Sequence, residues 1–294
     1  MILQGTWVAA VTPFRQGKID LDAYRNLIRH MVAGGVDGLV PCGTTGEASV
    51  LTHQEYVHIV EVAVEEAGGQ LPVFAGTGSN STAKTIETTR LAKEIGCTGA
   101  LVVTPYYNKP TQDGLYAHYR EIALEVPDFP IFLYNVPSRT SVNMLPETTA
   151  KLSEIDTVVG IKEASGSVAQ ILETISQVEG RVAVFSGDDI MNLALYAMGG
   201  TGTISVAANV DPARTAAVWQ EFQRGNLAEA QRLQLELLPL IHALFIETNP
   251  APAKAALSMM GLCDNELRLP LVPVTDKSMA KIRHVLDELG IIAA

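Results

Sequence analysis

Cysteine is scarce in this sequence and forms no motif. The three cysteines, Cys42, Cys97 and Cys263, lie far apart, and none belongs to a C-x-x-C pair. This pattern excludes a disulfide-built scaffold and is typical of a protein of the reducing cytosol. Most of the six histidines lie in helical patterns. We therefore expect no metal site and a cytoplasmic location.

Positive charge is also in short supply. Lys and Arg total 21 against 32 Asp and Glu, so the formal net charge is −11. No basic run offsets this deficit, and we expect neither a nucleic-acid partner nor an anionic membrane partner. An anionic substrate stays possible, because it needs only a local basic pocket.

Long apolar runs and a basic leader are absent as well. The first positive side chain is Arg15, which does not fit the start of a signal peptide. The most apolar late stretch, residues 235–246, is interrupted by Glu236 and is too short to cross a bilayer. A protein without a membrane span is expected.

The sequence does contain a repeated alternation of short apolar runs with amphipathic helical runs. The predicted strands cover residues 7–11, 38–42, 72–75, 100–103, 131–134, 158–165, 182–185 and 202–206. Their apolar character without clean alternation is typical of parallel strands that are covered on both faces. Eight such units predict an α/β fold, a (β/α)8 TIM barrel.

We expect the catalytic barrel to occupy residues 1–224 and a small C-terminal helical domain to occupy residues 225–294, where no convincing strand occurs. An open doubly wound sheet is the alternative fold. It requires a glycine-rich turn after the first strand, and residues 11–14, Val-Thr-Pro-Phe, do not provide one.

Lys162 is the candidate nucleophile. Alternation along the strand predicts that Val158, Gly160 and Lys162 face the same way, with open space beside Gly160 below the lysine. Burying a charged amine among apolar groups is costly, and a neutral amine can form a Schiff base with a carbonyl. A lysine at a strand end can also reach solvent, so this stretch alone leaves a structural role open.

Other polar groups follow the predicted strands at the end where TIM barrels have their active sites. They are hydroxyls and backbone groups rather than a cluster of Cys, His and carboxylates. Each one alone could belong to an ordinary turn, an interface or the core. Their shared position beside a lysine favours imine chemistry with hydroxyl-mediated proton transfer. The residues are Thr44, Thr45, Tyr106, Tyr107, Tyr134, Gly187, Ile204 and Ser205.

Four segments, in this order and spacing, closely resemble the dihydrodipicolinate synthase family of the pyruvate-dependent class I aldolases. They are residues 43–47, 104–108, 134–140 and 160–164, and the likeness extends from Gly5 to Asn249-Pro250 and beyond. The resemblance implies condensation of pyruvate with L-aspartate-4-semialdehyde on the route to diaminopimelate and lysine. It implies no cofactor, because a covalent imine with Lys162 activates the pyruvate.

The resemblance also implies roles for the catalytic residues. Lys162 forms the imine, and Tyr134 donates and accepts protons. Thr44 connects Tyr134 to Tyr107, which comes from a neighbouring subunit. The family usually forms tetramers that are dimers of dimers, and we expect a homotetramer here.

Substrate binding is assigned in the same way. Thr45 binds the carboxylate of pyruvate through a backbone N–H and its hydroxyl. Gly187 and Ile204 place backbone groups near the imine. Arg139 binds the carboxylate of the semialdehyde with two parallel hydrogen bonds, a geometry that a lysine does not offer.

Two other functions compete with this interpretation. One is a related aldolase for a sugar acid of the sialate or 2-keto-3-deoxygluconate type. Those enzymes typically carry Gly-Ser-Thr-Gly-Glu at the first motif and lack the Pro-Ser-Arg-Thr found at residues 137–140. The other is a catalytically silent barrel that binds a small molecule, against which the intact Lys162, Tyr134, Thr44 and Tyr107 argue.

Finally, the resemblance suggests a cleft for the inhibitor lysine at the tight dimer interface. Position 56 is usually His in inhibited bacterial enzymes and position 84 is usually Glu. Lys84 reverses a charge where the cationic side chain of the inhibitor would be received, so we expect inhibition to be weak or absent. The residues implied to line the cleft are Ser49, His53, Tyr56, Asn80, Lys84 and Tyr106.

Overall fold

Eight parallel strands form the centre of the computed structural model, which describes residues 3–292. Hydrogen bonding gives the order β4-β1-β10-β9-β8-β7-β6-β5, and a parallel bridge between Leu39 and Val73 joins the two ends. The predicted TIM barrel is therefore confirmed. The strands are β1 (Gly5–Ala9), β4 (Gly38–Val40), β5 (Phe74–Gly76), β6 (Gly99–Val103), β7 (Ile131–Asn135), β8 (Val158–Glu163), β9 (Ala183–Ser186) and β10 (Gly202–Ser205).

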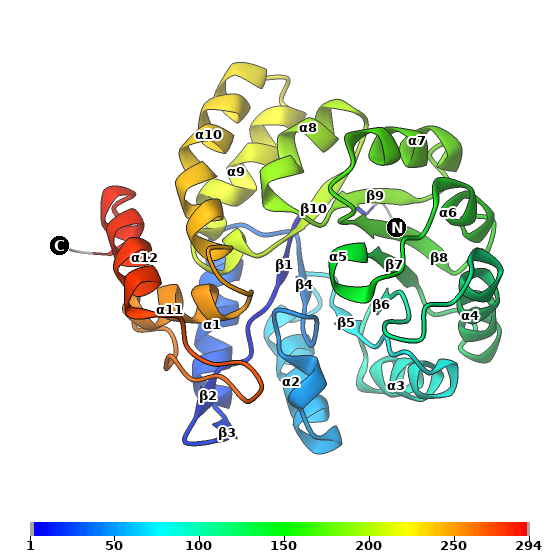
Figure 1. Ribbon diagram of the computed structural model, residues 1–294, viewed down its shortest axis with the longest axis horizontal. Coiled ribbons are helices and arrows are strands. Elements are labelled where there is room, and N and C mark those ends of the chain that lie inside the picture. Colours follow the sequence, from blue (N-terminus) through cyan, green and yellow to red (C-terminus); the bar gives the residue numbers. More distant parts are fainter. Residues whose placement is uncertain (1–2, 293–294) are drawn as a thin grey trace.

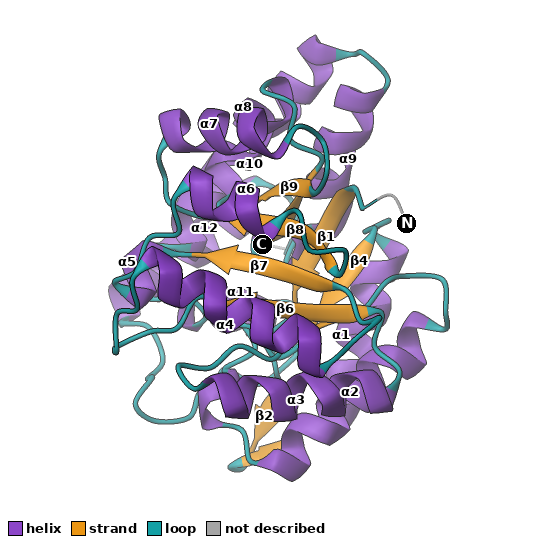
Figure 2. Ribbon diagram, turned by 90° about the vertical axis from the view of Figure 1, so that its right-hand side faces the viewer, coloured by secondary structure: helices purple, strands orange, loops and turns teal. Residues whose placement is uncertain are grey.

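Helices surround the strands on the outside (Figures 1 and 2). Several helices begin directly after a residue whose side chain caps the N-terminus of the helix. Thr52 and Glu55 form a capping box directly before His53, and the Asp211 side chain caps the helix that begins at Pro212. The helices are α1 (Leu21–Ala33), α2 (His53–Ala67), α3 (Thr82–Ile95), α4 (Gln112–Glu125), α5 (Pro137–Thr140), α6 (Pro146–Leu152), α7 (Val168–Val178), α8 (Asn192–Ala197) and α9 (Pro212–Gln223).

Aromatic rings fill the barrel interior. Trp7, Phe74, Phe132 and Phe185 are almost completely buried, and the ring centroids of their contacting pairs lie 5.0–6.0 Å apart. These rings occupy the space below Lys162. A Cβ on Gly160 would lie only 2.4 Å from the Phe132 ring, so the expectation of open space beside this glycine is wrong. Gly160 is required because an aromatic ring already fills that position.

A register shift in β8 corrects a second expectation. Ile131 pairs with Val158, but the next residue, Phe132, pairs with Gly160. Val159 is thus an extra residue, as in a β-bulge, and the alternation of side chains restarts after it. Val158 packs in the outer core, between the strands and the helices. Lys162 keeps its expected direction, but Val158 does not share it.

The C-terminal segment is helical, as the sequence indicates, and comprises α10 (Leu227–Leu244), α11 (Ala251–Met259) and α12 (Asp276–Glu288). Helix α10 packs along α9, and Gln234 on it donates a hydrogen bond of 3.0 Å to the backbone carbonyl of Asp189. The segment therefore contacts the barrel extensively, and its division from the barrel after residue 224 remains our proposal. No helix within residues 3–292 has both the length and the apolar character needed to cross a membrane.

A short antiparallel hairpin of β2 (Phe14–Arg15) and β3 (Lys18–Ile19) precedes α1 and was not anticipated from the sequence. Its turn is tied to the C-terminal segment, because the carboxylate of Glu266 accepts hydrogen bonds from the backbone N–H groups of Gln16 and Gly17. The hairpin is thus attached to the segment that follows α11.

Candidate active site

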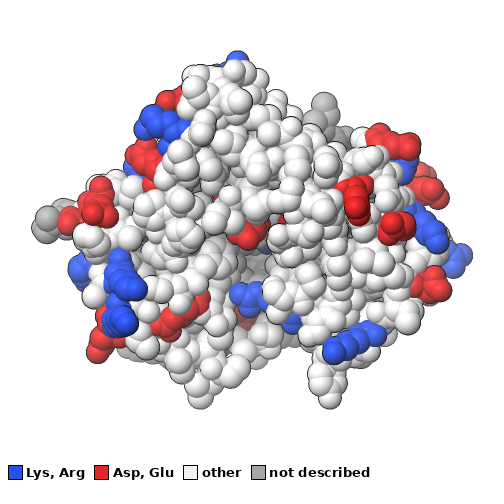
Figure 3. All heavy atoms as spheres, turned by 45° about the horizontal axis from the view of Figure 1, so that its top comes forward, with Lys and Arg blue, Asp and Glu red and all other residues white. Residues whose placement is uncertain are grey.

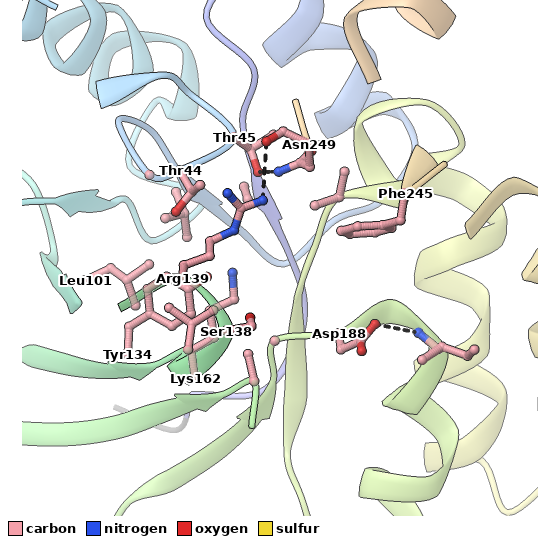
Figure 4. A pocket seen from close by; sticks show the side chains of 18 of the residues that line it. Thr44, Thr45, Leu101, Tyr134, Ser138, Arg139, Lys162, Asp188, Phe245 and Asn249 are labelled. Atoms are coloured by element: carbon pink, nitrogen blue, oxygen red, sulfur yellow. Dashed lines mark hydrogen bonds between the residues drawn. The ribbon is translucent and has the colours of Figure 1, made fainter. Parts of the chain in front are cut away.

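A cavity of about 370 Å³ opens among the carboxyl ends of the strands. Figure 4 shows side chains from several elements that point into this space. Residues from β7, β8 and the loops after β4 and β9 meet there with residues from the end of α10 and from the connection to α11. The sequence-predicted residues in the lining are Thr44, Thr45, Tyr134, Arg139, Lys162 and Gly187.

Lys162 lies at the floor of the cavity and is 5% exposed. Its Nζ is 4.4 Å from the centroid of the Tyr134 ring, because the two residues are register partners on β8 and β7. Gly187 provides room on the other side, since a Cβ there would lie 3.1 Å from both Cγ and Cε of the lysine. The amine is therefore confined between an aromatic ring and a glycine, with access to the cavity.

The turn after β4 contributes Thr44 and Thr45. It is closed by hydrogen bonds of 3.1 Å from the Gly46 N–H to the Gly43 carbonyl and from the Glu47 N–H to the Thr44 carbonyl. None of the hydrogen bonds within residues 3–292 uses the backbone N–H of Thr44 or Thr45. Such donors, at a turn beside a cavity, can receive a carboxylate.

Arg139 comes from the short helix α5, directly after β7. One of its terminal nitrogens, Nη2, donates a hydrogen bond of 3.3 Å to the backbone carbonyl of Asn249. A guanidinium has five N–H donors, so several remain for a ligand. Figure 4 places the guanidinium above the Lys162 amine, on the same side of the cavity as Thr44.

Two further polar residues of the lining were not assigned from the sequence. Asn249 donates a hydrogen bond of 3.0 Å to Thr45 Oγ1, and Asp188 lies across the cavity. Burial raises the pKa of the Asp188 carboxyl, although the Ile190 N–H and the charge of Lys162 oppose this rise. Asn249 lies in a segment quoted for the family resemblance, and Asp188 directly follows the predicted Gly187. The sequence pattern does not reveal, however, that the connection between α10 and α11 folds over the open end of the barrel.

Other predicted residues lie outside the cavity lining. Ile204 on β10 is buried in the aromatic interior, near Trp7 and Phe185. Tyr107 is 88% exposed and has a φ of 74°, an uncommon backbone conformation for an aromatic residue. Tyr106 is 40% exposed. Within a single chain, neither tyrosine belongs to the lining of the cavity that holds Lys162.

The residues expected at the inhibitor cleft gather near the beginnings of α2 and α3 and the loop after β6. Ser49, His53 and Lys84 are exposed, and Asn80 accepts a hydrogen bond at its backbone carbonyl from Asn108. Tyr56 differs from them, because its side chain packs in the core with its hydroxyl unpaired. Burial raises the pKa of this hydroxyl well above its ordinary value.

Figure 3 shows a hollow near the centre of one face, into which charged side chains of both signs reach. No group of three or more His, Cys, Asp or Glu residues in the described chain is arranged to hold a metal ion. What the cavity does offer is an amine, hydroxyls, a guanidinium and turn N–H groups.

A TIM barrel with a confined lysine at the end of a strand is the architecture of a Schiff-base-forming aldolase. A sequence model described as the Dihydrodipicolinate synthetase family matches residues 2–289. The chain belongs to this family.

Its relatives cover it along its whole length. A protein of Pelobacter propionicus named 4-hydroxy-tetrahydrodipicolinate synthase is 48% identical over 291 residues, which are 99% of this chain and 100% of that protein. The crystal structure of dihydrodipicolinate synthase from Thermotoga maritima superposes with a TM-score of 0.98 at 44% identity and covers 99% of this chain and 100% of that one. The chloride-inhibited enzyme from Acinetobacter baumannii, complexed with pyruvate, gives a TM-score of 0.97 at 41% identity, with 99% and 100% covered.

Proposed function

We propose that this chain condenses pyruvate with L-aspartate-4-semialdehyde to 4-hydroxy-tetrahydrodipicolinate, the committed step toward diaminopimelate and lysine. The observation that carries the proposal is the confined Lys162 amine, 4.4 Å from the Tyr134 ring centroid, in a cavity that also contains Arg139. The name shared by the full-length relatives supports it. We place the reaction in the cytoplasm, and it needs no external cofactor.

The chemistry begins at the Lys162 amine. Its nitrogen attacks the keto carbon of pyruvate, and water leaves as the imine forms. The imine withdraws electrons, so a methyl proton is lost and an enamine results. The enamine carbon attacks the aldehyde carbon of the second substrate. Finally, the substrate's own amino group attacks the imine carbon, which closes the ring and releases the lysine.

Proton transfers accompany several of these steps and require positioned hydroxyls. Tyr134 is the proposed donor and acceptor, since its ring centroid lies 4.4 Å from the Lys162 amine. Thr44 lines the same cavity. The relay is completed by Tyr107 of a second subunit, which the high exposure of this residue in one chain supports. We propose a tetramer built as a dimer of dimers.

The two carboxylates of the substrates are bound separately. Thr45 and the turn N–H groups receive the carboxylate of pyruvate, next to the lysine. Arg139 receives the carboxylate of the semialdehyde, because its guanidinium stands farther out in the cavity and keeps free donors. Ile204 is proposed to act only through its backbone, since its side chain belongs to the aromatic interior.

A coupled assay tests the proposed function. The purified protein is given pyruvate with L-aspartate-4-semialdehyde or, to test the reverse reaction, 2-keto-3-deoxygluconate alone, whose cleavage would release pyruvate. We expect turnover with the semialdehyde and none with the sugar acid. Turnover with the sugar acid but not with the semialdehyde would identify the protein as the related sugar-acid aldolase. Absence of a pyruvate adduct after borohydride reduction would identify it as a catalytically silent barrel that binds a small molecule.

Subunit mixing tests the shared site. Tyr107→Phe should lower turnover while leaving the ring contact between subunits, because only the hydroxyl is removed. Mixtures of Tyr107→Phe and Thr44→Val subunits should regain part of the activity, since some mixed dimers hold one site without either change. Each variant exchanged with itself is the control. A mixture that stays inactive after subunit exchange has been verified would contradict the contribution across the interface.

Inhibition by lysine is expected to be weak or absent. Lys84 brings a positive charge to the position where the inhibitor's cationic side chain would be received, and like charges repel. Initial rates should therefore fall by less than about half at millimolar lysine. The Lys84→Glu variant, which reverses this charge, should be more sensitive. Strong inhibition of the unmodified protein would show that Lys84 turns away into solvent.

A further inference from the structure

Two cross-links join the turn after β4 to the beginning of α11. The first faces the cavity and is the hydrogen bond from Asn249 to Thr45 Oγ1. The second lies behind it and is an ion pair of 2.5 Å between Glu47 and Lys254, whose side chains are both 0% exposed. Neither Glu47 nor Lys254 lines the cavity. The two cross-links lie close together along both segments, because Glu47 follows Thr45 by two positions and Lys254 follows Asn249 by five.

Both charges of this buried pair have further directional partners. Lys254 Nζ donates a hydrogen bond of 2.7 Å to the backbone carbonyl of Glu266 and lies 3.9 Å from the centroid of the Phe14 ring. Glu47 Oε2 accepts a hydrogen bond of 3.2 Å from the backbone N–H of Arg268. Glu47 itself has a φ of 52°, so the turn ends in a left-handed residue that its surroundings must stabilise.

Such a pair contributes little to stability by itself. Removing two charges from water costs free energy that their attraction only partly returns, and apolar residues of similar volume often serve equally well. Burial accordingly lowers the pKa of Lys254, against the opposing charge of Glu47. An ion pair with fixed hydrogen bonds sets the relative direction and register of two segments. An apolar contact does not.

We propose that the Glu47–Lys254 pair positions Thr45 for the capture of pyruvate. This inference rests on the proposed function, in which Thr45 receives the pyruvate carboxylate. Because Thr45 Oγ1 accepts from Asn249, its own hydrogen is free to be donated to that carboxylate. Loss of the pair releases the turn from α11, and misplacement of a binding group by about 1 Å can cost up to about a hundredfold in rate.

The test compares the pyruvate dependence of the imine trapped by borohydride in four proteins. These are the unmodified chain, Glu47→Gln, Lys254→Met and the double variant Glu47→Met with Lys254→Met. We expect the pyruvate concentration for half-maximal trapping to rise about tenfold or more in all three variants. The KM for the semialdehyde should change much less, because the Arg139 backbone is held within its own helix α5.

Thermal unfolding of the same proteins separates positioning from stability. The double variant replaces the charges by apolar side chains of similar length, so its midpoint should recover toward that of the unmodified chain. Its raised requirement for pyruvate should persist. Glu66→Gln is the matched control, since it makes the same substitution at a carboxylate paired with Arg25 and Arg29 on the barrel exterior. It should leave pyruvate dependence unchanged.

The outcomes distinguish this inference from the proposed function. If the unmodified protein traps no pyruvate, the proposed function fails. If it does, and the double variant recovers normal pyruvate dependence together with its thermal midpoint, the pair is only structural and the inference is overturned. Unchanged pyruvate dependence in Glu47→Gln, which keeps the side-chain volume, would overturn it as well, whether or not the other variants fold.

Discussion

Replacing Lys162 by arginine is expected to abolish the pyruvate adduct and to lower turnover by at least about a thousandfold, because the guanidinium keeps its proton and cannot attack a carbonyl. The structure favours retention of the fold, since Gly187 leaves space beside this side chain and the cavity lies above it. Intact mass after borohydride reduction with pyruvate measures the adduct. Circular dichroism of the variant verifies that it is folded.

The residue that carries the reduced pyruvate adduct identifies the lysine that forms the imine. Peptide mapping of the reduced adduct of the unmodified protein should find pyruvate on Lys162. Lys151→Arg is the matched control, because Lys151 is exposed on α6, and this variant should keep the full adduct. Label on Lys151 or on the exposed Lys109 would show that another amine reacts.

Replacing Arg139 by alanine should impair use of the semialdehyde far more than imine formation with pyruvate. Loss of a charge-assisted pair of hydrogen bonds costs about 2–3 kcal/mol, which corresponds to about a 30- to 150-fold fall in kcat/KM for the semialdehyde. Steady-state rates with each substrate varied in turn, beside single-turnover trapping of pyruvate, measure the two effects.

Arg139→Lys distinguishes charge from geometry at this position. It keeps the positive charge but not the two parallel hydrogen bonds, so most of the loss should remain. Equal impairment of both substrates would instead indicate a structural role. The structure contains one such contact, the hydrogen bond from Arg139 to the carbonyl of Asn249.

The eight strand–helix units could be predicted because they depend on local patterns. Apolar runs between polar helical runs identify parallel strands, and caps such as Thr52 and Asp211 locate helix starts to within a residue or two. The positions of Thr44, Tyr134 and Lys162 then follow from one rule, that the carboxyl ends of the strands meet at one end of a barrel. The cavity brings these three residues together.

Predictions that needed the direction of individual side chains were less successful. A bulge at Val159 reverses the alternation within β8, and nothing in the run of apolar residues signals it. The space beside Gly160 is filled by Phe132 from the neighbouring strand. Strand pairing and packing between strands decide both details, and these depend on residues distant in the sequence.

By itself, the sequence determined the fold class, the family and the set of reactive groups, because these depend on periodicity, on motifs and on the order of the strands. Only the tertiary structure decided which groups surround the amine, and how the C-terminal segment takes part. Asn249 and Lys254 reach Thr45 and Glu47 across more than two hundred residues. Such contacts arise because helices pack against the barrel and their buried polar groups need hydrogen-bond partners. A local sequence pattern does not identify the distant residue that becomes each partner.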